Sequence, residues 1–250
     1  MYLWRRLATP QWWSENEEDL RAQFGNTLAV IERPNRKQLQ IEVACDDAKP
    51  LKKFGGRARK LSRDWLKQIQ RKQKTKPIKV GNRKLIMPAG AAFGTGTHAT
   101  TAMSLRLLVR ISQKLKPGWS MVDLGTGSGI LALAAKFLGA KRVIGLDNDP
   151  VAISTAKGNA RRNKIDNVSF RSADVRRWKP SRKIDIVTAN LFSELLIEIL
   201  PKLKRARWLI LSGILHEQEH DLVRALKHNK INLLEARRRG KWVAVLATLS

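Results

Sequence analysis

The chain has 250 residues, of which 43% are hydrophobic, so it can bury the core of one large domain or of one domain with a small module. Its 49 lysines and arginines outnumber 21 acidic residues, and a net charge of +28 attracts polyanions such as RNA without specifying a fold. With a single cysteine, Cys45, the chain has no intrachain disulfide and no cysteine-rich zinc site, and we expect no metal. No apolar run is long enough for a bilayer or a signal peptide, so we expect a cytoplasmic protein with no membrane partner.

Residues 1–50 are predicted to form a small α/β module. We expect a strand at its beginning and then a helix, which starts in a capping box of Ser14 and Glu17 and ends near Gly25. Two strands joined by a turn at Pro34 complete the module. A unit of this size buries little surface and leans on a neighbour.

Residues 51–80 are predicted to form a basic linker. They contain twelve lysines and arginines against one acid, Asp64. Apolar residues at helical spacing predict a helix over 61–73, and Pro77 should lie beyond its end. The charge run is either a solvated surface or a site at which a polyanion binds.

Residues 81–250 show strands alternating with helices. Periodicity predicts helices over 129–139, 149–163, 193–204 and 217–229, and strands over 120–125, 142–148, 168–174, 184–190, 207–213, 231–236 and 242–249. Such alternation predicts an α/β fold with a mostly parallel seven-stranded sheet covered on both faces. A short basic turn joins the last two strands, which should form an antiparallel hairpin at the sheet edge.

The first of these strands runs into a glycine-rich loop, DLGTGSG, which begins at Asp123. Glycines at this position allow a tight turn and the close approach of a ligand to the backbone, so we expect Gly125 and Gly127 to bind a cofactor. Asp123 should orient the loop or contact the ligand. The spacing G-x-G-x-G differs from that of dinucleotide-binding loops and argues against an NAD-dependent oxidoreductase.

Polar side chains also end the next three strands. Asp147 occupies the position from which a carboxylate reaches ribose hydroxyls, Asp174 should lie near the edge of a base, and Asn190 ends the fourth strand. The alternative for each acid is a helix cap or a turn, which is our interpretation of Asp149 before Pro150. Ligands of open α/β sheets bind at these strand ends, so a shared site is expected there.

A segment rich in glycine and threonine, AFGTGTHATT, precedes the first strand and opens a helix. The amides at such a helix start can point at a ligand. The segment is either a helix cap or part of the site, and His98 within it is either a structural histidine or a residue at the site entrance.

The strings AFGTGTHATT, VDLGTGSGILALAA, LDNDPVA, TANL and LSGIL closely resemble the ribosomal protein L11 methyltransferase family (PrmA), over roughly residues 60–250. The resemblance implies a Rossmann-like class I methyltransferase that uses S-adenosyl-L-methionine, behind a small N-terminal module that recognises the ribosomal protein. By the same resemblance, cofactor contacts fall on Thr101, Gly125, Asp147 and Asn190.

The function expected from these observations is N-methylation of lysine, of the N-terminal amine, or of both, on a large-subunit ribosomal protein. Asn190 is the expected catalytic residue, offering its side-chain carbonyl to the acceptor amine or the cofactor. The basic surface suggests that the protein also binds rRNA. Two alternatives stay open: methylation of RNA or another protein, and a non-enzymatic ribosome-binding module, against which the glycine loop and Asp147 argue.

Overall fold

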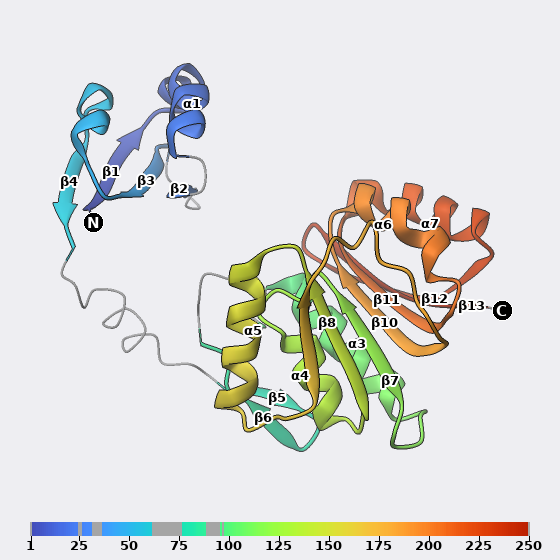
Figure 1. Cartoon of the computed structure of the whole chain (residues 1–250). Coiled ribbons are helices and arrows are strands. Elements are labelled where there is room, and N and C mark those ends of the chain that lie inside the picture. The colour runs from blue at the N-terminus through green and yellow to red at the C-terminus, as the bar shows by residue number, and fades with distance from the viewer. Residues whose placement is uncertain are drawn as a thin grey trace. The chain divides into compact units, whose positions relative to one another are not determined.

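The structure is a computed structural model that describes residues 2–24, 27–31, 37–61, 77–88, 96 and 98–249. The chain divides into two compact units, Met1–Lys72 and Gln73–Ser250 (Figure 1). The helix expected over 61–73 falls almost entirely outside the described residues, as do the expected helix end at Gly25 and the turn at Pro34.

The first unit is a four-stranded antiparallel sheet with a helix and a 3-10 turn. Its strand order is β2-β3-β1-β4. The elements are β1 (Tyr2–Ala8), α1 (Pro10–Phe24), β2 (Leu28–Ile31), β3 (Leu39–Cys45), η2 (Lys49–Phe54) and β4 (Arg57–Lys60). Its own small core includes Trp4, Leu20, Ile41 and Val43, and the Trp4 indole Nε1 donates to the carbonyl of Gly55 at 2.7 Å.

Two features of this unit differ from the sequence-based expectation. The helix α1 begins at Pro10, one turn before Ser14, because Thr9 accepts a hydrogen bond from the Trp12 amide through Oγ1 at 3.1 Å and Pro10 suits the first helical position. The predicted capping box at Ser14 is therefore wrong. Residues 51–60, assigned to the linker, instead form most of η2 and all of β4, and β4 pairs with β1.

The second unit contains the predicted seven-stranded sheet, in the order β12-β13-β11-β10-β7-β8-β9. The strands are β7 (Ser120–Leu124), β8 (Arg142–Asp147), β9 (Val168–Ser172), β10 (Ile184–Asn190), β11 (Ala206–Leu215), β12 (Ile231–Arg239) and β13 (Trp242–Leu249). The strands β9, β8, β7, β10 and β11 run parallel, whereas β13 is antiparallel to both β11 and β12. The predicted fold class and the edge hairpin are confirmed. A short hairpin, β5 (Ile78–Val80) with β6 (Arg83–Leu85), precedes this sheet in the chain.

Helices cover the two faces of this sheet unequally. One core cluster joins the sheet to α3 (Ala99–Ser112), α4 (Ile130–Phe137) and α5 (Pro150–Arg162). The other joins it to α6 (Ser193–Ile199), η3 (Leu200–Leu203) and α7 (Glu219–His228), which follows η4 (His216–Gln218) (Figure 1). The crossover from β9 to β10, residues 173–183, contains no helix. On the face that carries α6 and α7, the strands β8 and β9 therefore lack the helical cover expected from a sheet covered on both faces.

Hydrogen bonds made by side chains reinforce the pairing of β7 with β10. The Asp185 carboxylate accepts from the Ser120 amide at 2.7 Å and from the Ser120 hydroxyl at 2.8 Å. At the other end of the pair, Thr188 lies opposite Asp123 in the ladder. These hydrogen bonds place the strand ends that carry the candidate site. Within the part of the chain that the structure describes, no helix is both long and apolar enough to cross a membrane.

Candidate functional site

A cavity of about 430 Å³ lies at the carboxyl ends of the parallel strands. Its wall includes Gly125 and Gly127 from the loop after β7, Asp147 from the end of β8, Asp174 after β9 and Asn190 from the end of β10. Sequence reasoning placed these five residues at one edge of the sheet, and the structure brings them together around one cavity.

The glycine loop is shaped by backbone conformations that favour glycine. Gly125 has φ of 68° and Gly127 has φ of 51°. A Cβ atom on Gly125 would lie 2.4 Å from Cδ2 of Leu191, so the loop packs against the segment after β10 and a side chain here would displace Leu191. The loop thus presents bare backbone to the cavity.

Asp147 links the glycine loop to the next strand. Its Oδ2 accepts a hydrogen bond from the Gly127 amide at 2.8 Å, and its Oδ1 accepts one from the Asp149 amide at 3.1 Å. An ionised carboxylate has about four acceptor sites, so both oxygens retain the capacity to accept from hydroxyl groups in the cavity. As expected, Asp149 caps α5, accepting from the Val151 amide at 2.8 Å.

Asp123 lies beneath the loop and does not line the cavity. Its side chain is buried, and its carboxylate accepts hydrogen bonds from the Thr126 hydroxyl at 2.7 Å and the Thr188 hydroxyl at 2.6 Å. Burial raises the pKa of this carboxyl to about 6, against the lowering effect of the two hydroxyls. Of the two roles expected for Asp123, the geometry therefore favours orienting the loop over contacting a ligand.

Asn190 connects the end of β10 to the start of α3. Its Nδ2 donates to the hydroxyl of Thr100 at 3.2 Å and to that of Thr101 at 3.5 Å. Thr100 lines the cavity, whereas Thr101, the residue expected to contact a cofactor, is buried behind it and is absent from the wall. With its nitrogen held in this way, Asn190 has its carbonyl oxygen to offer to a ligand.

An aromatic pair completes the wall: His98, a candidate for the site entrance, and Trp242, which sequence reasoning did not assign to the site. The rings of His98 and Trp242 meet edge to face, with centroids 5.2 Å apart and planes at 65°. His98 precedes α3, and its Nδ1 lies 2.8 Å from the Thr100 hydroxyl, whereas Trp242 begins β13. Only the antiparallel return of β13 brings Trp242 here, so no local signal could have shown it.

The segment after β10 forms the remaining apolar part of the wall. Leu191 and Leu195 line it, and Phe192 is 75% exposed beside them. Gly213 also lines the cavity; it has φ of 90°, and a Cβ there would lie 2.3 Å from the Leu191 carbonyl oxygen. The site thus combines an apolar rim with polar groups at the strand ends, as small-molecule sites commonly do.

The cavity is lined by acidic side chains, although the chain as a whole is strongly basic. Asp147 and Asp174 both line it in a protein with a net charge of +28. Among the described residues, the one lysine or arginine that lines it is Arg176, which donates through Nε to Glu198 at 2.9 Å. A ligand with hydroxyl groups and a positive charge would therefore find complementary groups here.

Residues 16–249 match the family model described as ribosomal protein L11 methyltransferase (PrmA). A curated protein of that name from Desulforapulum autotrophicum is 42% identical over 177 residues, covering 68% of this chain and 57% of its own length. Another, from Symbiobacterium thermophilum, is 36% identical, covering 69% of this chain and 62% of its own length. The chain therefore spans about 57 to 62% of the length of these two relatives.

Solved structures agree with this result. A ribosomal protein L11 methylase from Lactobacillus delbrueckii subsp. bulgaricus matches with a TM-score of 0.57 and 31% identity, over 63% of this chain and 81% of that one. Magnesium protoporphyrin IX methyltransferase from Synechocystis PCC 6803, crystallised with bound SAM, matches at a TM-score of 0.51 and 20% identity over 60% of this chain and 79% of its own, which shows the fold alone. The chain belongs to the ribosomal protein L11 methyltransferase (PrmA) family.

Proposed function

We propose that the chain is an S-adenosylmethionine-dependent protein methyltransferase that modifies ribosomal protein L11, a large-subunit protein. The observation that carries the proposal is the cavity at the strand ends, in which the bare glycine loop and the Asp147 carboxylate face the same space. The proposed substrate follows from the names of the relatives, and the cavity of this chain has groups that suit the cofactor.

The residues of the cavity fit S-adenosylmethionine. Asp147 can accept hydrogen bonds from ribose hydroxyls, and the loop at Gly125 and Gly127 lines the cavity without side chains. The apolar side chains of Val175 and Leu195 suit the flat faces of a nucleobase. When bound, this cofactor supplies an electrophilic methyl group on a sulfonium, and the carboxylates of the cavity suit that positive charge.

The protein must then present the acceptor amine in its neutral form. A lysine with a reference pKa near 10.4 costs about 4.6 kcal/mol to deprotonate at pH 7, and desolvation beside a positive charge lowers that cost. Trp242 and Phe192 can exclude water from the amine. The Asn190 carbonyl oxygen accepts a hydrogen bond from an N–H of the amine and so orients the lone pair of the amine nitrogen. Water suffices to take the proton, so no strong base is needed at this wall.

The methylated groups are inferred to be lysine side chains, the N-terminal amine, or both. The N-terminal unit, Met1–Lys72, recognises the ribosomal protein. We also infer that the basic surface binds rRNA and that the protein is cytoplasmic. The net charge of +28 supports the first inference, and the ribosomal substrate that the relatives' names give supports both.

A transfer assay tests the proposed function. The full chain is incubated with S-adenosylmethionine carrying a labelled methyl group and with ribosomes that lack this modification, and the label is then located by separating the ribosomal proteins from the RNA. We expect label in protein L11, and much less label with the Asp147→Ala variant. Label in RNA, or in other proteins alone, would overturn the substrate, and absence of any transfer would overturn the activity.

A further inference from the structure

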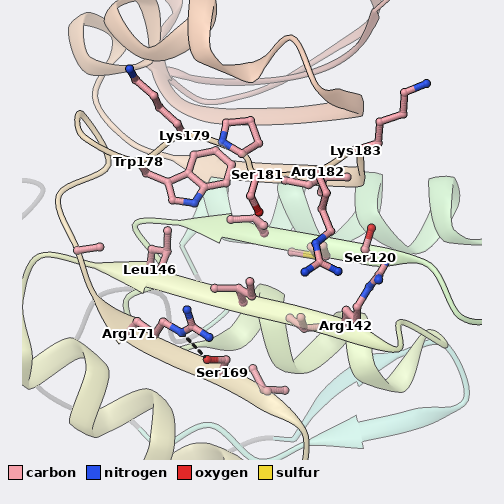
Figure 2. Close-up of a pocket in the computed structure, with 18 of the residues that line it drawn as sticks. Ser120, Arg142, Leu146, Ser169, Arg171, Trp178, Lys179, Ser181, Arg182 and Lys183 are labelled. Carbon is pink, nitrogen blue, oxygen red and sulfur yellow. Dashed lines mark hydrogen bonds between the residues drawn. The ribbon is translucent and has the colours of Figure 1, made fainter.

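A second cavity, of about 920 Å³, lies over β8 and β9 on the sheet face that carries α6 and α7 (Figure 2). Side chains alternate along a strand, so Arg142 of β8 points to the same face as Ile144, which packs against the core cluster on that side. The parallel register places Ser169 and Arg171 of β9 on this face as well. Among the described residues, none lines both this groove and the cavity at the strand ends.

The helix-free crossover, residues 173–183, forms the other wall of this groove. Its Trp178 packs against the core cluster on this face, while Arg182 and the residues beside it line the cavity. A helix at this place would cover β8 and β9 as the other helices cover their strands, but the crossover leaves the floor open. The groove therefore results from the missing helix.

The described residues that line the groove carry positive charge and include no acidic side chain. Six cationic residues contribute to it: Lys141, Arg142, Arg171, Lys179, Arg182 and Lys183. Within the described part of the chain, none of these six forms an ion pair with a carboxylate. Elsewhere on the same unit, arginines such as Arg176 and Arg237 do pair, with Glu198 at 2.9 Å and with Glu235 at 2.7 Å.

Two of these cations approach each other without a carboxylate between them. Figure 2 shows the Arg182 side chain descending from the crossover toward the strands and the Arg142 side chain extending toward it from β8. Arg171 donates through Nε to the Ser169 hydroxyl at 2.9 Å, which fixes its position at the floor. Like charges in this arrangement repel, and a phosphate can bridge them because guanidinium groups bind phosphate in a bidentate manner.

Trp178 distinguishes the class of polyanion. Its indole is half-buried and lines the groove, toward the other end from the Arg142 and Arg182 side chains (Figure 2). An aromatic platform along a basic groove is how proteins hold single-stranded nucleic acid, with phosphates on the cations and a base on the ring. An acidic peptide would use the charges but gain nothing from the ring. We propose that this groove binds a single-stranded stretch of RNA, with phosphate groups at Arg142 and Arg182 and a base against Trp178.

This inference is independent of the proposed methyl transfer, because the groove and the cavity at the strand ends have no lining residue in common among those described. The test uses the full chain and a short, unstructured, fluorescein-labelled RNA, with affinity measured by anisotropy over a series of salt concentrations. The test variant is Arg142→Gln/Arg182→Gln. The control, Arg106→Gln/Arg161→Gln, removes the same charge from exposed positions on α3 and α5.

We expect the groove variant to raise Kd about tenfold or more and to reduce the salt slope by about 0.7 for each phosphate that it no longer neutralises. The control should stay within about twofold of the unmodified chain. Equal losses of affinity in both variants, or no binding of RNA by the unmodified chain, would overturn the proposal, because binding would then follow net charge alone or not occur. Calorimetry with S-adenosylmethionine should give the same affinity for both variants, which separates this test from that of the enzyme.

A second pair of variants tests the aromatic part. Trp178→Ala should weaken RNA binding by about fivefold or more, and Trp178→Phe should retain most of the affinity, since both rings stack. Thermal unfolding measures how far either change disturbs the packing, and Trp178→Phe keeps the test valid where the alanine variant is unstable. Polyglutamate that competes with RNA at equal charge, together with no effect of Trp178→Ala, would assign the groove to acidic proteins instead.

Discussion

Asp147 holds the turn of the glycine loop through a direct hydrogen bond, with its Oδ2 2.8 Å from the backbone nitrogen of Gly127. The same carboxylate faces the cavity at the strand ends. One side chain therefore both shapes the loop and offers acceptors to a ligand. This double role makes Asp147 the most sensitive position of the proposed cofactor site.

Replacing Asp147 with alanine should weaken S-adenosylmethionine binding by about tenfold to a hundredfold. Hydrogen bonds to a charged group contribute about 1.5–3 kcal/mol, and the Gly127 amide would also lose its acceptor. Isothermal titration calorimetry measures the change. Asp166→Ala is the matched control, because Asp166 is exposed and does not line the cavity. Equal affinities for Asp147→Ala and the unmodified protein would contradict the assignment.

Asn190→Ala should lower kcat by about tenfold or more while leaving most of the cofactor affinity, because the variant lacks the carbonyl proposed to orient the acceptor. The hydrogen bond from Asn190 to Thr100 contributes about 1 kcal/mol, so the melting temperature should fall by only about 2–4 °C. Steady-state kinetics and thermal unfolding are compared on the same preparation. Undiminished turnover in the folded variant would remove this role.

Asp123 should make stability depend on pH between about 4 and 6. Its pKa in the folded protein is raised by burial to about 6 from an ordinary 3.8, so the folded state binds more protons than the unfolded state in this range. The contribution of this group therefore favours folding at low pH and is lost as the pH rises through about 6, by about 3 kcal/mol in total.

Asp123→Asn should abolish that dependence, because the amide retains the shape but does not ionise. The melting temperature of each protein is measured across this pH range, and the difference between them reports the single group. Since Asn can still bond to the hydroxyls of Thr126 and Thr188, the variant should fold. A constant difference between the two proteins at every pH would show that Asp123 titrates at its ordinary value.

Gly213→Ala should destabilise the protein and weaken cofactor binding more than the strain of a positive φ alone would. Gly213 has φ of 90°, and a Cβ would lie 2.3 Å from the backbone oxygen of Leu191, which cannot move without displacing Asn190. Gly118→Ala is the control, with φ of 103° and nothing within 4 Å of the added Cβ. We expect a cost of about 1–3 kcal/mol for the control and a larger one for Gly213→Ala, with weaker cofactor binding. Equal melting temperatures and affinities would refute the steric argument.

The fold of the second unit and most of its cavity could be predicted from the sequence because those features depend on local signals. Apolar runs marked β7 to β13, and polar residues such as Asp147 and Asn190 directly followed them, so the parallel topology brought them together. The glycine loop could be placed for the same reason. None of these predictions needed information on how distant segments pair.

The rest depended on packing between distant segments. The strand β4 has the sequence RARK, with no apolar pattern, and it forms because β1 offers it a free edge. Trp242 reaches the cavity only through the return of β13. The strand β7 is buried along its whole length, so its sequence could not show that Asp123 points away from the ligand space. The start of α1 was misplaced because Thr9 and Pro10 offer an earlier cap.

The hydrogen bonds of Asp185 with Ser120, at one end of the β7–β10 pair, and of Thr188 with Asp123, at the other, have a consequence for the cavity. Sliding one strand by a single residue would break both links at once and move Asn190 by about 3.3 Å along the sheet while turning its side chain to the opposite face. These two sets of hydrogen bonds thus keep the Asn190 amide in register with the turn at Gly125, although the two residues of each pair are 65 positions apart along the chain. The pairing of β7 with β10 therefore already aligns the two parts of the cavity wall, the glycine loop after β7 and Asn190 at the end of β10.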